Sequence, residues 1–81
     1  MDMTFSCIIR STDAAIFSGR AKSVTLPTVS GEVQVLSAHA DAFIALIAGT
    51  VVVEAEDGSK QSFALRGGVF RMKDDVATLV A

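Results

Sequence analysis

Residues 50–65 read TVVVEAEDGSKQSFAL, a turn signal between two strand patterns. A β-branched run over residues 50–55 and an alternating run over residues 60–65 flank the segment Glu56-Asp57-Gly58-Ser59. β-branched and aromatic residues favour strands, and Asp-Gly between two strand patterns marks a hairpin because glycine adopts the positive φ that the turn needs. The stretch therefore predicts two antiparallel strands joined by a tight turn.

The same alternation of strand and turn signals continues through the rest of the chain. Further strands are predicted over residues 4–10, 22–26, 32–36, 69–73 and 76–80, and turns over residues 17–19, 29–31, 48–49, 66–68 and 73–75. Residues 37–41 are expected to form a turn-like segment, and residues 42–47 a short strand. Turn signals that recur at intervals of about 8–12 residues are typical of all-β sandwiches and barrels. We therefore predict an all-β, two-sheet β-sandwich.

Length and charge limit what such a protein can be. The 81 residues suffice for one hydrophobic core, so residues 1–81 are predicted to form a single domain. Seven basic and nine acidic residues give a net charge of −2, which argues against binding nucleic acid by general electrostatic attraction. Mean hydropathy is +0.51, which is high for so small a chain. We interpret it as apolar surface reserved for a partner; a merely hydrophobic, marginally stable β-domain is the alternative.

No group of residues in the sequence has the pattern of a catalytic site. Cys7 and His39 are the only cysteine and the only histidine, which is too few ligands for a structural zinc site. Cys7 lies in a strand pattern, so we expect it to be a small buried side chain. We therefore predict no catalytic residue, no cofactor and no metal. An enzyme that uses Cys7 with His39 as its base is the alternative, and it requires a low thiol pKa.

Four short motifs give the chain a family resemblance. They are, in order, Phe17-Ser18-Gly19, Gly31-Glu32-Val33, His39-Ala40 and Gly67-Gly68-Val69. In order and spacing they resemble the N-terminal β-sandwich domain of the F-type ATP synthase epsilon subunit, called delta in mitochondria, over essentially the whole chain. The resemblance implies about ten short strands in two sheets. It also implies a non-catalytic rotor subunit of the central stalk, which joins the gamma subunit to the c-ring and couples proton or sodium transport to ATP synthesis or hydrolysis.

The resemblance also implies contact residues. Glu32 and His39 match family residues near the c-ring loops, and Phe43 and Ile44 are our candidates for apolar contacts with gamma. Each has a structural alternative: a solvated strand-end carboxylate for Glu32, a hydrogen-bonded turn histidine for His39, and core packing for the two apolar residues.

Turn glycines and one loop complete the comparison with the family. The glycines expected to serve turns through their backbone angles are Gly19, Gly31, Gly67 and Gly68. The family usually reads Pro-Gly-His-Ala-Pro around the histidine, whereas this chain reads Ser37-Ala38-His39-Ala40-Asp41. Without both prolines and the glycine, we expect a less rigid or differently shaped loop. Asp41 also changes the charge that the loop offers to the c-ring.

The expected location follows from the resemblance and from the absence of targeting signals. Residues 1–6 lack the basic and apolar regions of a signal peptide. The longest uncharged apolar stretch, residues 42–53, is shorter than the roughly 20 residues of a spanning helix. We expect a peripheral protein at the cytoplasmic face of the bacterial inner membrane, held there by the ATP synthase. The family's C-terminal helical hairpin is not in the sequence, which leaves open whether the chain is naturally short.

A different class of function also fits the sequence. A free-standing β-sandwich that binds proteins outside any ATPase would have the same strand pattern and the same excess of apolar residues. Such a module would not bind gamma, and it would be able to form homodimers through its apolar face.

Overall fold

The structure is a computed structural model that describes residues 3–11, 15–38 and 40–81. Within these ranges the chain forms eight strands: β1 (Phe5–Arg10), β2 (Ala15–Thr28), β3 (Gly31–Leu36), β4 (Ala42–Leu46), β5 (Gly49–Ala55), β6 (Lys60–Leu65), β7 (Gly68–Lys73) and β8 (Val76–Val80). The described part of the chain contains no helix long and apolar enough to cross a membrane.

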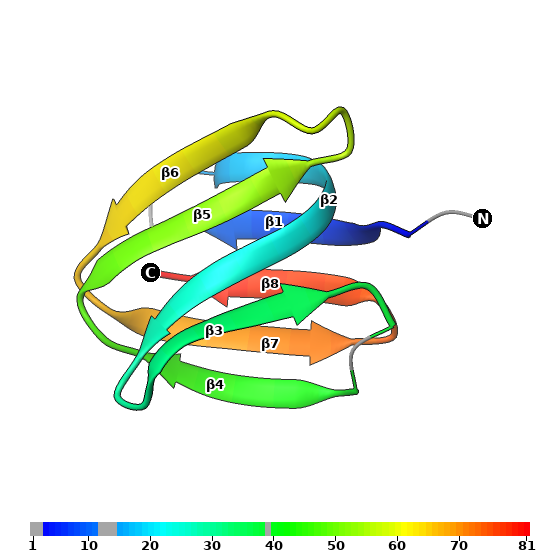
Figure 1. The fold of residues 1–81 in the computed structure, drawn as a ribbon. Coiled ribbons are helices and arrows are strands. Elements are labelled where there is room, and N and C mark those ends of the chain that lie inside the picture. The colour runs from blue at the N-terminus through cyan, green and yellow to red at the C-terminus, as the bar shows by residue number, and fades with distance from the viewer. Residues whose placement is uncertain (1–2, 12–14, 39) are drawn as a thin grey trace.

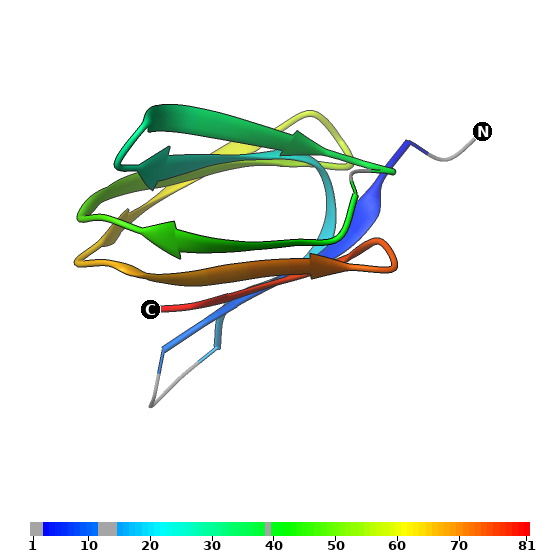
Figure 2. The same ribbon diagram turned by 90° about the horizontal axis from the view of Figure 1, so that it is seen from below.

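The strands belong to one hydrogen-bonded sheet that curls into two facing layers (Figures 1 and 2). The order is β4-β7-β8-β1-β2-β5-β6, and β3 pairs with β2 outside this path. We call β4, β7, β8, β1 and the first half of β2 the first layer, and β3, the second half of β2, β5 and β6 the second layer. The predicted all-β sandwich is confirmed.

Strand β2 joins the two layers. Its first half pairs with β1, from Ala15 to Ala21, and its second half pairs with β3 and β5. The register shifts between Ala21 and Ser23, and such a bulge bends a strand, as Figure 1 shows for β2. Because one strand of 14 residues serves both layers, the described residues contain eight strands. The prediction of about ten short strands is therefore wrong in number.

The prediction of a turn at residues 17–19 is also wrong, because these residues lie within β2. Gly19 lies within β2 opposite Cys7 of β1, and it is not among the residues with positive φ. A Cβ at Gly19 would lie 3.6 Å from the ring of Phe17, an ordinary contact distance. Phe17 in turn packs against Phe63 of β6, with ring centroids 6.1 Å apart. The sequence misled us because a glycine inside a strand gives the same signal as a turn glycine.

The remaining predicted turn glycines do adopt unusual backbone angles. Gly31 has a φ of +106°, and Gly67 and Gly68 each have a φ of +141°. The backbone role expected of these three residues fits these values, since L-residues rarely adopt them. The hairpin predicted from residues 50–65 is confirmed as β5 and β6, with Gly58 at a φ of +90°.

The hydrophobic core lies between the two layers. Inward residues alternate with outward residues along most strands, as the period of a pleated strand requires. The buried cluster consists of Phe5, Cys7, Ile9, Ala21, Val24, Leu26, Val35, Leu46, Val51, Val53, Leu65, Phe70, Met72, Ala77 and Leu79. Parallel pairing of β1 with β8 brings the first and last strands together in the first layer. The outward residues are therefore the ones left for partners.

Candidate interaction surfaces

The outward side chains of the first layer form a surface that is both apolar and basic. They alternate with core residues and pair with one another across the strands. They are Phe43 and Ala45 of β4, Val69, Arg71 and Lys73 of β7, Val76, Thr78 and Val80 of β8, Ser6, Ile8 and Arg10 of β1, and Ser18 and Arg20 of β2. We call this surface the outer face of the first layer. None of these described side chains is acidic.

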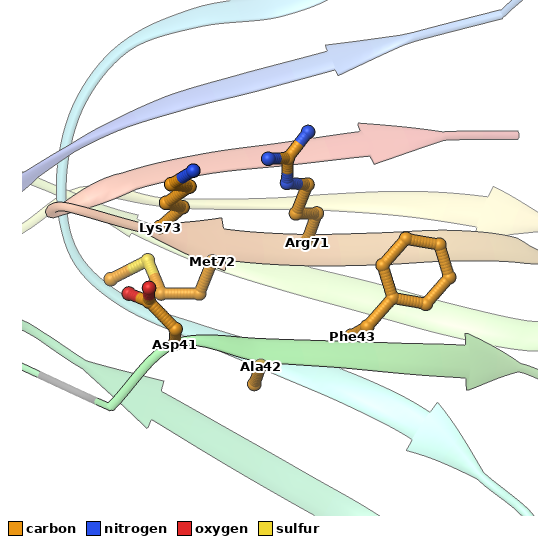
Figure 3. A pocket seen from close by; sticks show the side chains of 6 residues that line it. All are labelled: Asp41, Ala42, Phe43, Arg71, Met72 and Lys73. Atoms are coloured by element: carbon orange, nitrogen blue, oxygen red, sulfur yellow. The ribbon is translucent and has the colours of Figure 1, made fainter.

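Phe43 is the most prominent apolar residue of this face. Its side chain is 75% exposed although it is a large aromatic group on a strand. It lies beside Arg71 in the β4–β7 register, and Figure 3 shows both side chains projecting from neighbouring strands together with Lys73. An open hollow of about 340 Å³ is lined by Phe43, Val69, Arg71, Thr78 and Val80. Exposed apolar residues gathered around a hollow are typical of a protein-binding surface.

The outer face of the second layer has a different character. Its outward residues are mostly hydroxyl, amide and charged side chains, among them Thr50, Glu54, Ser62 and Gln34. This composition suits contact with water. The two faces of the sandwich therefore differ, and the strands of the first layer carry five exposed large apolar residues: Ile16, Phe43, Val69, Val76 and Val80.

Ile44 does not share the surroundings of Phe43. It is half-buried and packs against the core cluster, whereas its neighbour Phe43 points outward. Successive residues of a strand point to opposite faces, so one partner lying on the sheet cannot contact both side chains. The structure thus supports core packing for Ile44, the alternative recognised from the sequence, and leaves Phe43 as the exposed candidate.

Glu32 is the second residue of β3, and it does not line the hollow beside Phe43. It follows the turn between β2 and β3, where the Thr28 hydroxyl donates a 2.7 Å hydrogen bond to the Gly31 carbonyl and accepts one from the Ser30 amide at 3.2 Å. These bonds hold the turn, and Val29 at its tip is 87% exposed. The tip therefore presents an apolar side chain and a carboxylate on a well-defined hairpin.

His39 lies outside the described residues, but the segment around it can be placed. The Ala38 amide donates to a carboxylate oxygen of Asp75 at 2.9 Å, and the Asp74 amide donates to Asp41 at 3.3 Å. These bonds tie the segment to the turn between β7 and β8. Strand β3 separates that end of the molecule from Glu32, so the structure does not place Glu32 beside this segment.

The loop that departs from the family pattern is held by hydrogen bonds. Ala38 stands where the pattern has glycine, and it adopts a φ of 60°. Asp41 stands where the pattern has proline, and its carboxylate accepts the bond from Asp74. Asp74 and Asp75 themselves have φ values of 51° and 59°. Aspartate tolerates this left-handed region better than most residues, which fits a tight turn between β7 and β8.

Cys7 has none of the properties of a nucleophile. Its side chain is 1% exposed, and burial raises the pKa of the thiol to about 11. A catalytic thiol needs a lowered pKa and access to substrate. Among the described residues, no three His, Cys, Asp or Glu side chains come together to hold a metal ion. The described geometry thus gives no support to the alternative of an enzyme built on Cys7.

The raised pKa of Cys7 predicts a loss of stability in alkali. The thiol ionises more easily in the unfolded chain, so its contribution to stability is present below about pH 9 and is lost as the pH rises toward 11. We expect the free energy of unfolding to fall by about 2–3 kcal/mol more over this range than in Cys7→Ala. Urea unfolding at pH 8 and pH 11 measures the difference. If the free energy of unfolding fell equally with pH in both proteins, the raised pKa of the Cys7 thiol would be contradicted.

Comparison with known proteins adds sequence relatives and structural neighbours. The family profile described as "ATP synthase, Delta/Epsilon chain, beta-sandwich domain" matches residues 4–81. The ATP synthase epsilon chain of Bordetella petrii is 32% identical over 78 residues, and that of Chromohalobacter salexigens is 35% identical over 78 residues. Each match covers 96% of this chain and 55% of the relative. The chain therefore spans little more than half the length of these relatives.

Solved structures share the fold. A chain in the Euglena gracilis mitochondrial ATP synthase (OSCP/F1/c-ring) superposes with a TM-score of 0.91 at 24% identity, covering all of this chain and 52% of its own length. A chain in the central stalk/c-ring structure of the Tetrahymena thermophila mitochondrial ATP synthase gives a TM-score of 0.76 at 16% identity. That match covers 93% of this chain and 60% of the other.

Proposed function

Because the chain belongs to the family of ATP synthase delta/epsilon β-sandwich domains, we propose that it works in the central stalk of an F-type ATP synthase. In this role it is a rotor subunit without catalytic activity, and residues 1–81 form one β-sandwich domain. It links the gamma subunit to the c-ring, so that rotation driven by proton or sodium transport reaches the catalytic head. Both sequence relatives named above are epsilon chains, which supports this role.

One observation supports the proposal: the domain has two candidate contact surfaces that differ in their chemistry and share no residue. The outer face of the first layer is apolar and basic, and the β2–β3 tip offers Val29 and Glu32. A protein that only bound one partner would need one such surface. A linker between two subunits needs two, and they must lie apart so that both partners bind at once.

We assign the outer face of the first layer to gamma. A standard interface buries about 800 Å² on each partner, and a few apolar or aromatic anchors supply most of its affinity. Phe43 is such an anchor, since it is large, exposed and beside a hollow. The face is built on paired strands, so its shape is fixed before the partner arrives.

The β2–β3 tip is the surface that we assign to the c-ring. A carboxylate at this tip can pair with basic or amide groups of the c-ring loops, and the bonds made by Thr28 hold it in position. The resemblance assigns His39 to the same contact; this residue lies outside the described residues, and its role stays a prediction.

Reversing the charge of Glu32 tests the assignment to the c-ring. Glu32→Lys is expected to reduce ATP-driven ion pumping by about 2- to 10-fold while leaving ATP hydrolysis and domain stability unchanged, because an exposed ion pair contributes about 0–1 kcal/mol and its reversal adds repulsion. Lys60→Glu, a charge reversal on β6, is the control. Unchanged pumping in Glu32→Lys membranes would remove Glu32 from the interface.

The proposed location follows from the complex. The domain lies at the periphery of the membrane through its partners, and the bacterial origin of both relatives favours the cytoplasmic face of a bacterial inner membrane.

Co-purification with the gamma subunit of the same genome tests the proposed function as a whole. Size-exclusion chromatography with light scattering is expected to show a one-to-one complex. A homodimer that does not bind gamma would favour the free-standing protein-binding module, which would use the same apolar face for self-association.

A further inference from the structure

We infer that the partner surface that binds the outer face of the first layer is acidic. This partner surface places carboxylates over Arg71 and Lys73, and it inserts an apolar side chain into the hollow between Phe43 and Val80. The identification of that partner as gamma rests on the proposed function. The acidic character of the partner follows from the residues of the face itself.

Basic side chains gather on the outer face of the first layer. The whole chain has seven basic and nine acidic residues. Four of the seven basic residues, Arg10, Arg20, Arg71 and Lys73, point outward from the first layer, and no described outward side chain of that layer is acidic. An acidic protein has thus gathered more than half of its cations on one face. Electrostatic complementarity between partners is a general property of specific interfaces, so the complement of this face is acidic.

Arg71 lies at the hollow, and Lys73 lies two residues further along the same strand. Both side chains are exposed. Arg71 itself lines the hollow with Phe43 and Val80. Directly paired residues on neighbouring strands have Cβ atoms about 5 Å apart, so a partner that fills the hollow brings its border residues within reach of both cations.

Two aspartates lie near these cations: Asp41 lines a hollow with Arg71 and Lys73, and Asp74 lines another with the same two cations. Asp41 accepts a hydrogen bond from the Asp74 amide, and both residues belong to the loops at one end of the face. They leave the middle of the face without a negative charge. They also set its boundary, because a partner carboxylate placed over them would be repelled.

Charge complementarity favours a protein partner over an anionic membrane. The chain has a net charge of −2, and Glu32 and Glu54 lie on the second layer. An anionic bilayer would attract one face and repel the rest of the domain. The hollow is also an indentation between strands, which suits a single protruding side chain better than a flat lipid surface.

Binding of the cognate gamma subunit, measured by isothermal titration at 50 and 300 mM NaCl, tests the inference. The double variant Arg71→Glu/Lys73→Glu is expected to weaken binding at 50 mM NaCl by about 100-fold, because close charge pairs at interfaces couple strongly and reversal adds repulsion. Its loss of affinity between the two salt concentrations is expected to be smaller than that of the unchanged protein. Lys60→Glu, with the same kind of charge reversal on the second layer, is expected to change binding by less than about 3-fold.

The outcomes separate this inference from the proposed function. Unchanged binding by the double variant, with loss of binding in Phe43→Asp, would leave the gamma assignment standing and overturn the acidic complement. Equal weakening by Lys60→Glu would overturn it too, because the effect would then belong to overall charge. Failure of the unchanged protein to bind gamma would overturn the proposed function. Binding to phosphatidylserine vesicles, lost in the double variant, would assign the face to a membrane and overturn the inference.

Discussion

Replacing Gly68 with alanine is expected to lower the free energy of unfolding by about 3 kcal/mol or more. Gly68 begins β7 with a φ of +141°, and a Cβ at this position would overlap the carbonyl oxygen of Val80 and lie 3.1 Å from the Cα of Ala81. The obstacle is backbone, which cannot move aside without breaking the β7–β8 pairing. A domain of this length has only about 4–12 kcal/mol of stability, so a large fraction would be lost. Urea unfolding followed by circular dichroism measures the change.

Gly19→Ala is the matched control for this prediction. Gly19 has no positive φ, and its added Cβ would meet only the Phe17 ring at 3.6 Å. We expect its stability to change by less than about 1 kcal/mol, since alanine in a strand costs no more than glycine. The same comparison tests the correction of the predicted turn. Equal destabilisation by both substitutions would show that Gly19 serves a turn after all.

Phe43→Asp is expected to weaken binding to gamma by at least about 100-fold while leaving the free energy of unfolding nearly unchanged. The side chain is mostly exposed, so the folded domain loses little, whereas the partner loses an aromatic anchor and meets a buried charge. Titration calorimetry measures the affinity. Thr50→Asp, an exposed position on the second layer, is the control and should bind normally.

Substitution of Ile44, the residue after Phe43 in β4, is expected to affect stability where substitution of Phe43 affects binding. Because it packs against the core, Ile44→Asp places a charge among apolar groups and should reduce stability. Loss of binding in Phe43→Asp together with loss of stability in Ile44→Asp would fit the observed alternation. If Ile44→Asp stayed folded and lost only binding, the two faces of β4 would have been assigned the wrong way round.

Local patterns were sufficient to predict much of the fold. The β5–β6 hairpin follows from a β-branched run, Asp57-Gly58 and an alternating run, because all three signals act over a few residues. Strand β8 was also predicted with its observed bounds. These elements have regular alternation and tight turns, so neighbouring residues contain the information needed to recognise them.

The first half of β2 could not be recognised in the same way. Ala15 to Arg20 is mostly exposed and lacks the alternation of a half-buried strand. Its strand conformation comes from pairing with β1, and Gly19 gave a false turn signal. Ile16 and Phe17 were the only local hints, since such residues favour strands. Pairing between β1 and β8 joins the two ends of the chain and leaves no local trace.

The candidate surfaces were only partly visible in the sequence. The high mean hydropathy indicated apolar surface, but not where it lies. Phe43 and Arg71 are neighbours only because β4 pairs with β7, and the sequence does not specify that pairing. Alternation along residues 69–73 places Phe70 and Met72 on one face of the strand and residues 69, 71 and 73 on the other. It does not say which of the two sets faces the core. The structure resolves this by burying Phe70 and Met72.

Cross-linking in the assembled ATP synthase shows which subunits the two surfaces of the domain contact. Cysteine is introduced separately at Phe43 and at Glu32, while the buried native Cys7 contributes little reactivity. In membranes of the source organism, we predict that the Phe43→Cys product contains gamma and that the Glu32→Cys product contains the c subunit. Capture of the same subunit from both positions, or only of a second copy of this chain, would contradict the claim that the domain links two partners.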